Sequence, residues 1–266
     1  MVHFVGAGSG AADLITVRGK KLLEEADVII YAGSLVNPQL LDYKKDDCRV
    51  YNSATMTLEE VLEVMFATEE KGLTTVRLHT GDPCLYGAIR EQMDVLDEKK
   101  IRYDYCPGVS SFSGAASALN LEYTLPNVSQ SVIITRMAGR TPVPEKEEIA
   151  SFAAHQATMV VFLSTGMLEK LSERLIAGGY TADTPAAIVY KATWEDEKAF
   201  VCTVGTLAKT AAENQITKTA LMIIGDVVSH SHYDRSELYN PAFTTEFREA
   251  SAARRANTPG DTSTTE

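Results

Sequence analysis

The sequence predicts an α/β fold built from two α/β domains. Short apolar runs rich in β-branched residues alternate with segments of helical spacing through residues 1–121. A link around residues 120–127, with Pro126 as a stop, interrupts this pattern, and a second alternation fills residues 122–250. Alternation of this kind predicts strands covered by helices, parallel in the first domain. Residues 251–266 carry no large apolar side chain, which predicts a disordered tail.

The elements of the first domain follow from local pattern. The helix at 16–25 is expected to turn Val17, Leu22 and Leu23 inward, and Thr57 with Glu60 forms a capping box that starts the next helix. The expected strands span residues 2–5, 27–32, 48–51, 73–79 and 101–106, and the remaining helices span residues 88–98 and 109–119.

The second domain repeats the alternation with shorter connections. Its expected strands span residues 131–135, 158–163, 186–190, 199–204 and 220–224, and its expected helices span residues 167–178 and 206–214.

Charge and composition exclude several classes of protein. The net charge of −11 argues against a nucleic-acid partner, which needs a basic face. No apolar run is long enough for a membrane span, and the first residues lack the basic segment of a signal peptide. The four cysteines form no CxxC pair, which predicts free thiols in a reducing cytoplasm. His230 and His232 have no evident third ligand, so no metal site is predicted.

A Gly-Asp-Pro loop follows the expected strand at 73–79. Loops at the carboxyl ends of strands hold ligands in open α/β sheets. Gly81 lets the backbone approach a ligand, Asp82 offers a carboxylate to hydroxyl or ammonium groups, and Pro83 stiffens the turn. An ordinary tight turn is the alternative.

Two other turns after strands are candidate ligand loops. The turn Gly6-Ala7-Gly8-Ser9-Gly10 resembles a dinucleotide-binding fingerprint, with Asp27 about 20 residues further on. The fingerprint requires a third glycine at position 11, however, and that residue is Ala11. A plain loop or a site for another ligand remain as alternatives. In Pro107-Gly108-Val109-Ser110-Ser111, the two serines could cap a helix or bind a carboxylate.

Basic residues follow two strands of the second domain. Arg136 and Arg140 lie on a loop stiffened by Gly139, Pro142 and Pro144, which suits recognition of carboxylates by guanidinium groups. Solvated surface arginines are the alternative. Lys191 and Trp194, the single tryptophan, share a turn, where core packing of the indole is the simpler interpretation.

Taken together and in order, these segments resemble the tetrapyrrole (precorrin) methyltransferase family. The match rests on the glycine turn continuing to Asp13-Leu14-Ile15-Thr16, on Gly33-Ser34-Leu35-Val36, on the Gly-Asp-Pro and Pro-Gly-Val-Ser-Ser loops, and on the segments 135–144 and 190–194. It covers about residues 2–248 and is similar to the branch that methylates C11 of precorrin-4, with or without cobalt. Ser9 and Ala11 depart from the family's proline and aspartate.

The resemblance implies S-adenosylmethionine as cofactor, S-adenosylhomocysteine as product, a tetrapyrrole substrate, a cleft between the two domains and a homodimer. Asp82 is expected on the ribose or amino-acid part of the cofactor, away from the sulfur, because a carboxylate there would stabilise the charged ground state. His79 and Tyr86 are candidate catalytic bases. The cofactor site would comprise Ser9, Gly81, Asp82, Leu85, Ser110, Ser111, Leu163, Ala192 and Ala220, and a basic wall for the substrate would comprise Arg90, Arg136, Arg140 and Lys191.

Three alternatives remain open at this point. The first is a methyltransferase of the same family acting on another ring position, for example on uroporphyrinogen III or another precorrin. The second is a non-catalytic tetrapyrrole binder. The third is a nicotinamide oxidoreductase that uses the glycine turn, which the missing third spaced glycine disfavours.

Overall fold

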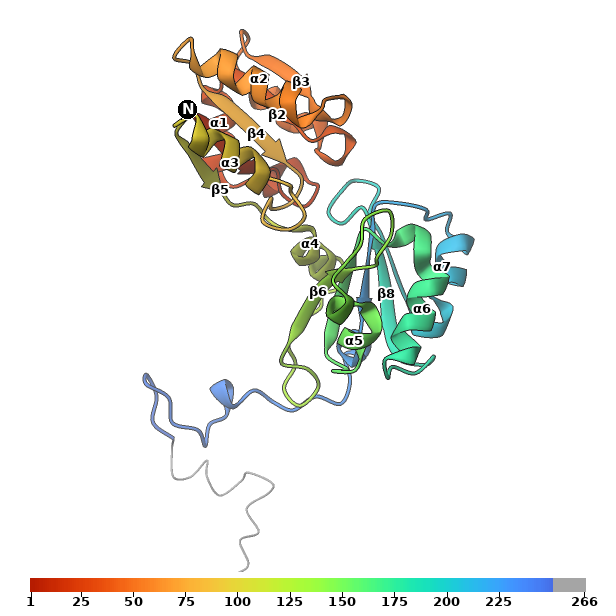
Figure 1. The fold of residues 1–266 in the computed structure, drawn as a ribbon. Coiled ribbons are helices and arrows are strands. Elements are labelled where there is room, and N and C mark those ends of the chain that lie inside the picture. Colours follow the sequence, from red (N-terminus) through yellow and green to blue (C-terminus); the bar gives the residue numbers. More distant parts are fainter. Residues whose placement is uncertain (251–266) are drawn as a thin grey trace, which may run out of the picture.

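The computed structural model describes residues 1–250, which form two five-stranded sheets joined through a short helix (Figure 1). The predicted tail at 251–266 lies outside the described residues. Helices and strands alternate in both halves, so the predicted α/β class is confirmed.

The N-terminal sheet is entirely parallel, in the order β3-β2-β4-β1-β5. Since all five carboxyl ends lie at one edge, the turns that follow the strands gather there. Gly6 pairs with His79, so the glycine turn and the Gly-Asp-Pro loop begin side by side. The strands are β1 (Val2–Gly6), β2 (Val28–Tyr31), β3 (Arg49–Asn52), β4 (Thr75–His79) and β5 (Tyr103–Cys106).

Helices cover both faces of this sheet. Leu23 of α1 (Val17–Glu25) packs on one face, while Met65 of α2 (Leu58–Glu69) and Leu96 of α3 (Arg90–Glu98) are fully buried on the other. The Thr57–Glu60 capping box is confirmed. The expectation for Val17 is wrong: it is the first helical residue, beyond the buried stripe, and its side chain is 89% exposed.

The C-terminal sheet is mixed, in the order β6-β7-β10-β8-β9. Strands β6 and β7 run parallel, whereas every other neighbouring pair is antiparallel. Its strands are β6 (Val132–Arg136), β7 (Thr158–Phe162), β8 (Pro185–Tyr190), β9 (Lys198–Thr203) and β10 (Ala220–Ile224). One face is covered by α5 (Ile149–Ala153), α6 (Leu168–Ala177) and α7 (Leu207–Glu213).

Helix α4 (Ser111–Ala118) belongs to the first half of the sequence but packs on the second sheet. Ala115 is fully buried in a cluster with Val189 of β8 and Ile223 of β10. Figure 1 shows α4 between the two bodies. The predicted division between residues 121 and 122 stays a prediction, but the packing of α4 crosses it.

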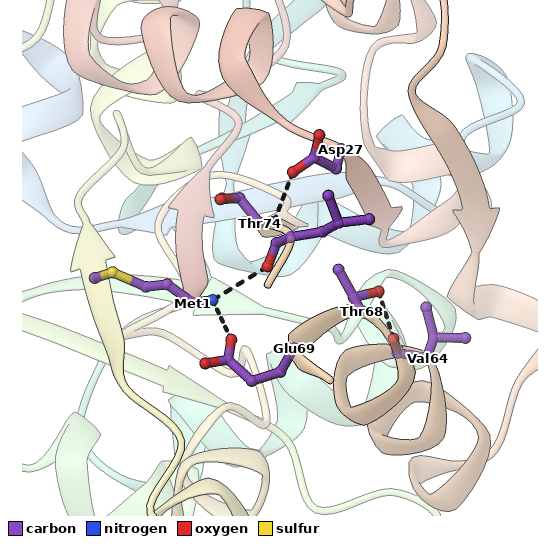
Figure 2. Close-up of polar contacts among 7 residues, drawn as sticks. Met1, Asp27, Val64, Thr68, Glu69 and Thr74 are labelled. Atoms are coloured by element: carbon purple, nitrogen blue, oxygen red, sulfur yellow. Dashed lines mark hydrogen bonds and ion pairs between the residues drawn. The ribbon is translucent and has the colours of Figure 1, made fainter. Parts of the chain in front are cut away.

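The amino-terminal edge of the first sheet is closed by polar contacts, as Figure 2 shows. Asp27 accepts hydrogen bonds from the backbone N–H of Thr74 at 2.7 Å and from Lys45 Nζ at 2.5 Å, and the Met1 ammonium group pairs with Glu69. The hydrogen bond from Lys45 is the main cause of a lowered pKa of Asp27, and the bond from Thr74 adds to it. Asp27 therefore lies at the edge opposite the ligand loops and is tied to the fold, away from any ribose bound at the glycine turn.

Residues 1–250 show neither a membrane-spanning helix nor a cluster of metal ligands. No helix in that range has both the length and the apolar character of a membrane span. No group of three or more His, Cys, Asp or Glu side chains gathers there as a metal site would require.

Candidate active site

A cavity of about 320 Å³ lies where the carboxyl edge of the first sheet meets the second sheet. Its walls come from the turns after β1 and β4, the start of α4, and the ends of β7, β8 and β10. The lining residues are Ser9, Ala32, Leu35, Arg77, His79, Thr80, Leu85, Tyr86, Gly87, Ser111, Phe162, Leu163, Val189, Lys191, Ala192, Trp194, Thr219, Ala220 and Leu221.

Three turns of the first domain pack backbone against backbone behind this wall. Gly8 and Gly81 exchange N–H···O=C bonds of 3.2 and 2.9 Å. Gly81 adopts φ +60°, and a Cβ on Gly108 would lie 2.2 Å from the Gly81 carbonyl oxygen. Only glycine fits such an approach. The close packing fixes the relative position of the glycine turn, the Gly-Asp-Pro loop and the turn before α4.

Asp82 ties these turns together and does not line the cavity. Its carboxylate accepts hydrogen bonds from the backbone N–H of Cys84 at 2.9 Å, from that of Gly108 at 3.1 Å and from the Tyr105 hydroxyl. Burial alone would raise the pKa of Asp82, but these hydrogen bonds outweigh it and hold the pKa below its usual value. The carboxylate is thus ionised and engaged by its own loops.

His79 stands where β4 enters the cavity. Its side chain is almost fully buried and Nε2 has no hydrogen-bond partner in the described part of the chain. Burial, helped by the charge of Arg77, lowers the pKa of His79 to about 3. The imidazole is therefore neutral and a weak base, able to exchange a hydrogen bond with a bound molecule. The hydroxyl of the next residue, Thr80, is buried without a partner as well.

Tyr86 lies opposite, after the Gly-Asp-Pro loop. Its ring centroid is 5.6 Å from that of Phe162, and its side chain is 45% exposed. Burial raises the pKa of Tyr86 against the opposing charge of Arg136, so the phenol stays protonated at neutral pH.

The second domain contributes mainly small or apolar side chains to the cavity wall, with a charged side chain at the rim. Ala192 and Ala220 are buried, Leu163 is 66% exposed, and the Trp194 indole packs against Gly10 so closely that a Cβ there would lie 2.3 Å from it. At the rim, Lys191 Nζ pairs with Asp196 at 2.6 Å and lies 5.6 Å from the Trp194 ring.

Four non-glycine residues that line the cavity adopt left-handed backbone conformations. Non-glycine residues rarely adopt them and do so at a cost that the surrounding structure must sustain. The lining residues concerned are Tyr86 (φ 58°), Leu163 (φ 53°), Lys191 (φ 45°) and Thr219 (φ 57°). Strain of this kind gathers at ligand sites, which supports a functional role for the cavity.

The predicted site residues divide into two groups. Those that line the cavity are Ser9, His79, Leu85, Tyr86, Ser111, Leu163, Lys191, Ala192 and Ala220. Those that do not are Gly81, Asp82, Ser110, Arg90, Arg136 and Arg140. Ser110 is the residue preceding α4 but its side chain makes no capping bond.

The predicted basic wall is not assembled. Arg90 lies on α3 and pairs with Asp94 at 2.8 Å and Asp97 at 2.9 Å. Arg136 donates to the carbonyls of Met137, Thr141 and Pro142, closing its own loop, while Arg140 is exposed on that loop. Of the four, Lys191 lines the cavity, while partners on their own helix and loop hold Arg90 and Arg136.

Sequence reasoning missed several lining residues. Leu35, after β2, belongs to the Gly33-Ser34-Leu35-Val36 match, which assigns it no role, and Ala32 is the last residue of the strand expected at 27–32. Arg77, within a buried strand, carried no local pattern that marked it.

Comparison with known proteins agrees with this geometry. Residues 1–208 match the family described as tetrapyrrole (corrin/porphyrin) methylases. The chain belongs to this family. A solved structure has the same tetrapyrrole methylase fold. It is the X-ray structure of a cobalamin biosynthetic enzyme, a cobalt precorrin-4 methyltransferase. It superposes on this chain with a TM-score of 0.84 at 43% sequence identity, covering 85% of this chain and 95% of that one.

Curated relatives span nearly the whole tetrapyrrole methylase chain. A cobalt-precorrin-4 C(11)-methyltransferase of Methanocaldococcus jannaschii is 51% identical over 249 residues, covering 94% of this chain and 96% of the relative. One of Priestia megaterium is 43% identical, covering 93% and 97%. A uroporphyrinogen-III C-methyltransferase of Bacillus subtilis is 30% identical, covering 87% and 92%.

Proposed function

We propose that this tetrapyrrole methylase transfers a methyl group from S-adenosylmethionine to C11 of precorrin-4 or cobalt-precorrin-4, in the biosynthesis of the cobalamin corrin ring. The observation that carries the proposal is 51% identity, over nearly the full length of both chains, to a relative named for that reaction. The relative named for uroporphyrinogen III is much less similar, at 30%.

The residues of the cavity fit an adenosyl cofactor. Ala192 and Ala220 leave space for a flat base, and the orphaned Thr80 hydroxyl offers a buried polar partner. Ser9, Leu85, Ser111 and Leu163 complete the proposed cofactor wall. Gly81, Asp82 and Ser110 stand behind it, and we assign to Asp82 the role of holding the loops in place.

S-adenosylmethionine supplies an electrophilic methyl group on a positively charged sulfur, and that charge disappears during transfer. Among the described residues, no aspartate or glutamate lines the cavity. The walls therefore do not favour the charged ground state over the transition state. The apolar faces of Phe162, Leu163 and Leu221 exclude water and restrict the approach of the acceptor carbon.

His79 and Tyr86 are proposed to contact the reacting ring rather than to act as strong bases. With a pKa of about 3, His79 offers a neutral imidazole, and Tyr86 offers a protonated phenol. Lys191 at the rim and Arg140 on the loop that Arg136 closes would meet carboxylates of the substrate. Arg90 stays outside this proposal, because it does not line the cavity and two carboxylates of its own helix, those of Asp94 and Asp97, already hold its guanidinium.

The deciding experiment is turnover of defined substrates. The protein is incubated with S-adenosylmethionine and either metal-free or cobalt precorrin-4, and the product is analysed by mass and by NMR of a labelled methyl group. We expect one added methyl at C11. A methyl elsewhere would assign the protein to another ring position, and tight tetrapyrrole binding without transfer would make it a non-catalytic binder.

We also propose a cytoplasmic homodimer. Four cysteines without a disulfide suit a reducing compartment. A second copy could cover the large apolar side chains exposed on residues 229–250, which run away from the C-terminal sheet in Figure 1: Tyr233, Leu238, Tyr239, Phe243 and Phe247. Light scattering at micromolar concentration should give about twice the chain mass.

A further inference from the structure

A buried guanidinium that has no acidic partner in the described part of the chain forms part of the cavity wall. Arg77 lies in β4, the central strand, and only 7% of it is exposed. Its Nε donates to Gln92 Oε1 at 3.2 Å and its Nη1 to the Ile30 carbonyl at 3.2 Å. Within residues 1–250 it forms no ion pair, and Nη2 has no protein acceptor. Buried charges are normally paired, so this one calls for an anion.

The charge of the surroundings points the same way. The protein carries a net charge of −11, yet its cavity wall contains two cations, Arg77 and Lys191, and no acid among the described residues. Lys191 already pairs with the partly exposed carboxylate of Asp196. Arg77 therefore provides the uncompensated positive charge of the cavity, in a site where low polarity strengthens its attraction for an anion.

Burial lowers the pKa of Arg77 to about 10, so the side chain remains a cation at neutral pH. Its charge also lowers the pKa of His79, two residues further along the same face of β4. An anion held at Arg77 would thus lie beside the His79 ring, at the part of the cavity wall that β4 forms.

We propose that Arg77 anchors a carboxylate of the tetrapyrrole substrate at the base of this cavity. The inference rests on the proposed function for the identity of the substrate, but the anion site rests on Arg77 itself. A guanidinium suits this task because its remaining N–H donors form charge-assisted hydrogen bonds to carboxylate oxygens.

The cofactor also carries a carboxylate, and the position of Arg77 favours the substrate. The proposed cofactor residues Ser9 and Ser111 follow β1 and β5, on one side of β4. Arg77 instead bonds to Ile30 of β2, on the other side of β4, where Leu35 lines the cavity. A tetrapyrrole, with carboxylates around its rim, can reach both sides.

Trp194 makes a direct binding assay feasible. It is the single tryptophan and lines the cavity, so quenching of its fluorescence reports occupancy of this site. The probe is uroporphyrin III, a stable polycarboxylate tetrapyrrole. The variants are Arg77→Gln and, as a matched loss of one positive charge, Arg102→Gln, whose side chain is exposed.

We expect Arg77→Gln to weaken uroporphyrin binding at least tenfold, about 1.4 kcal/mol, and Arg102→Gln to leave it within twofold. Binding of S-adenosylhomocysteine by calorimetry should stay within twofold in both. Equal uroporphyrin affinity in wild type and Arg77→Gln overturns the proposal. If the glutamine variant does not fold, Arg77→Lys, which keeps the charge, replaces it in the assay. Uroporphyrin binding that is at least threefold weaker in this variant supports the anchor, and unchanged binding overturns it.

A second ligand pair distinguishes the two sources of carboxylate. 5′-Methylthioadenosine shares the adenosyl thioether with S-adenosylhomocysteine but lacks its amino acid. If Arg77→Gln weakened binding of S-adenosylhomocysteine and not of methylthioadenosine, Arg77 would hold the cofactor and the proposal would be wrong. Wild-type turnover of precorrin-4 tests the proposed function separately, since an Arg77-dependent anion site can exist in a protein that methylates nothing.

Discussion

The hydroxyl of Ser9, in the turn after β1, lies 3.0 Å from the hydroxyl of Thr193, in the loop after β8. The same Thr193 oxygen accepts a hydrogen bond of 3.0 Å from the backbone N–H of Ala11. One side chain of the second domain therefore holds the glycine turn of the first at two points. It does so at the two residues, Ser9 and Ala11, that depart from the family's proline and aspartate.

Thr193→Val should test this contact, because valine keeps the shape and removes the oxygen. The Ser9 hydroxyl and the Ala11 N–H lose their partner, which we expect to cost about 1–2 kcal/mol of unfolding free energy. Affinity for S-adenosylhomocysteine should fall several-fold, as Ser9 is no longer oriented. Urea denaturation and calorimetry measure the two effects. Thr217→Val, at an exposed site, is the control; equal behaviour of the two variants would contradict the inferred tie.

Gly108→Ala should displace the Gly-Asp-Pro loop. The new Cβ would lie 2.2 Å from the Gly81 carbonyl oxygen and 2.7 Å from Gly6 Cα, so backbone must move. We expect a loss of about 1–3 kcal/mol in stability and at least tenfold weaker S-adenosylhomocysteine binding. Gly166→Ala, where nothing lies within 4 Å of the added atom, should change neither. Undiminished affinity in the Gly108 variant would remove these packed turns from the cofactor site.

Leu163→Gly should raise stability while weakening binding. Leucine at φ 53° is strained, and glycine removes that strain. After the entropy cost of glycine, we expect a gain of about 0.5 kcal/mol. Because the apolar side chain is lost from the cavity wall, the affinity for S-adenosylhomocysteine should fall at least threefold. Leu35→Gly, a lining leucine without a left-handed φ, should instead lose stability. Thermal unfolding gives the sign, and a less stable Leu163 variant would contradict the strain argument.

His79 predicts a pH dependence of stability. Its folded pKa of about 3 lies below the ordinary value of 6.5, so the unfolded chain binds the proton first. Stability from this residue is complete above pH 6.5 and declines as the pH falls toward 3, by at most about 1.4 kcal/mol per pH unit. His79→Gln should flatten the profile of unfolding free energy between pH 6.5 and 5. His155→Gln, at an exposed site, should retain the wild-type slope; identical slopes in both variants would be inconsistent with a neutral buried His79.

The sequence predicted elements where periodicity and turn chemistry are strong. Strand β4, the loop after it and the Thr57 cap were all found because a buried parallel strand and a capping box depend on neighbouring residues. Helix α5 was missed because five residues carry too little period to stand out. Strand direction was beyond local pattern: the antiparallel pairing of β10 with β7 and β8 depends on long-range packing.

The candidate site divides in the same way. The ligand loops were recognisable from Gly-Asp-Pro and Pro-Gly-Val-Ser-Ser, but where each carboxylate and guanidinium points depends on the tertiary fold. The contact of Asp82 with the cofactor stays a prediction, and the bond between its carboxylate and the Gly108 backbone could not be read from the sequence. No pattern in the sequence marks Arg77, and only the fold reveals that it has no acidic partner within residues 1–250.

The position of α4 also affects how the chain folds during its synthesis. The helix is complete at Ala118, yet its fully buried Ala115 packs against Ile223, in a strand that ends at Ile224. At about 5–20 residues per second, a ribosome needs roughly 5–20 s to make the intervening segment. During that interval the first sheet can form while the apolar face of α4 stays uncovered. An apolar surface of the helix that later adjoins the cavity therefore stays exposed on the nascent chain until β10 has been made.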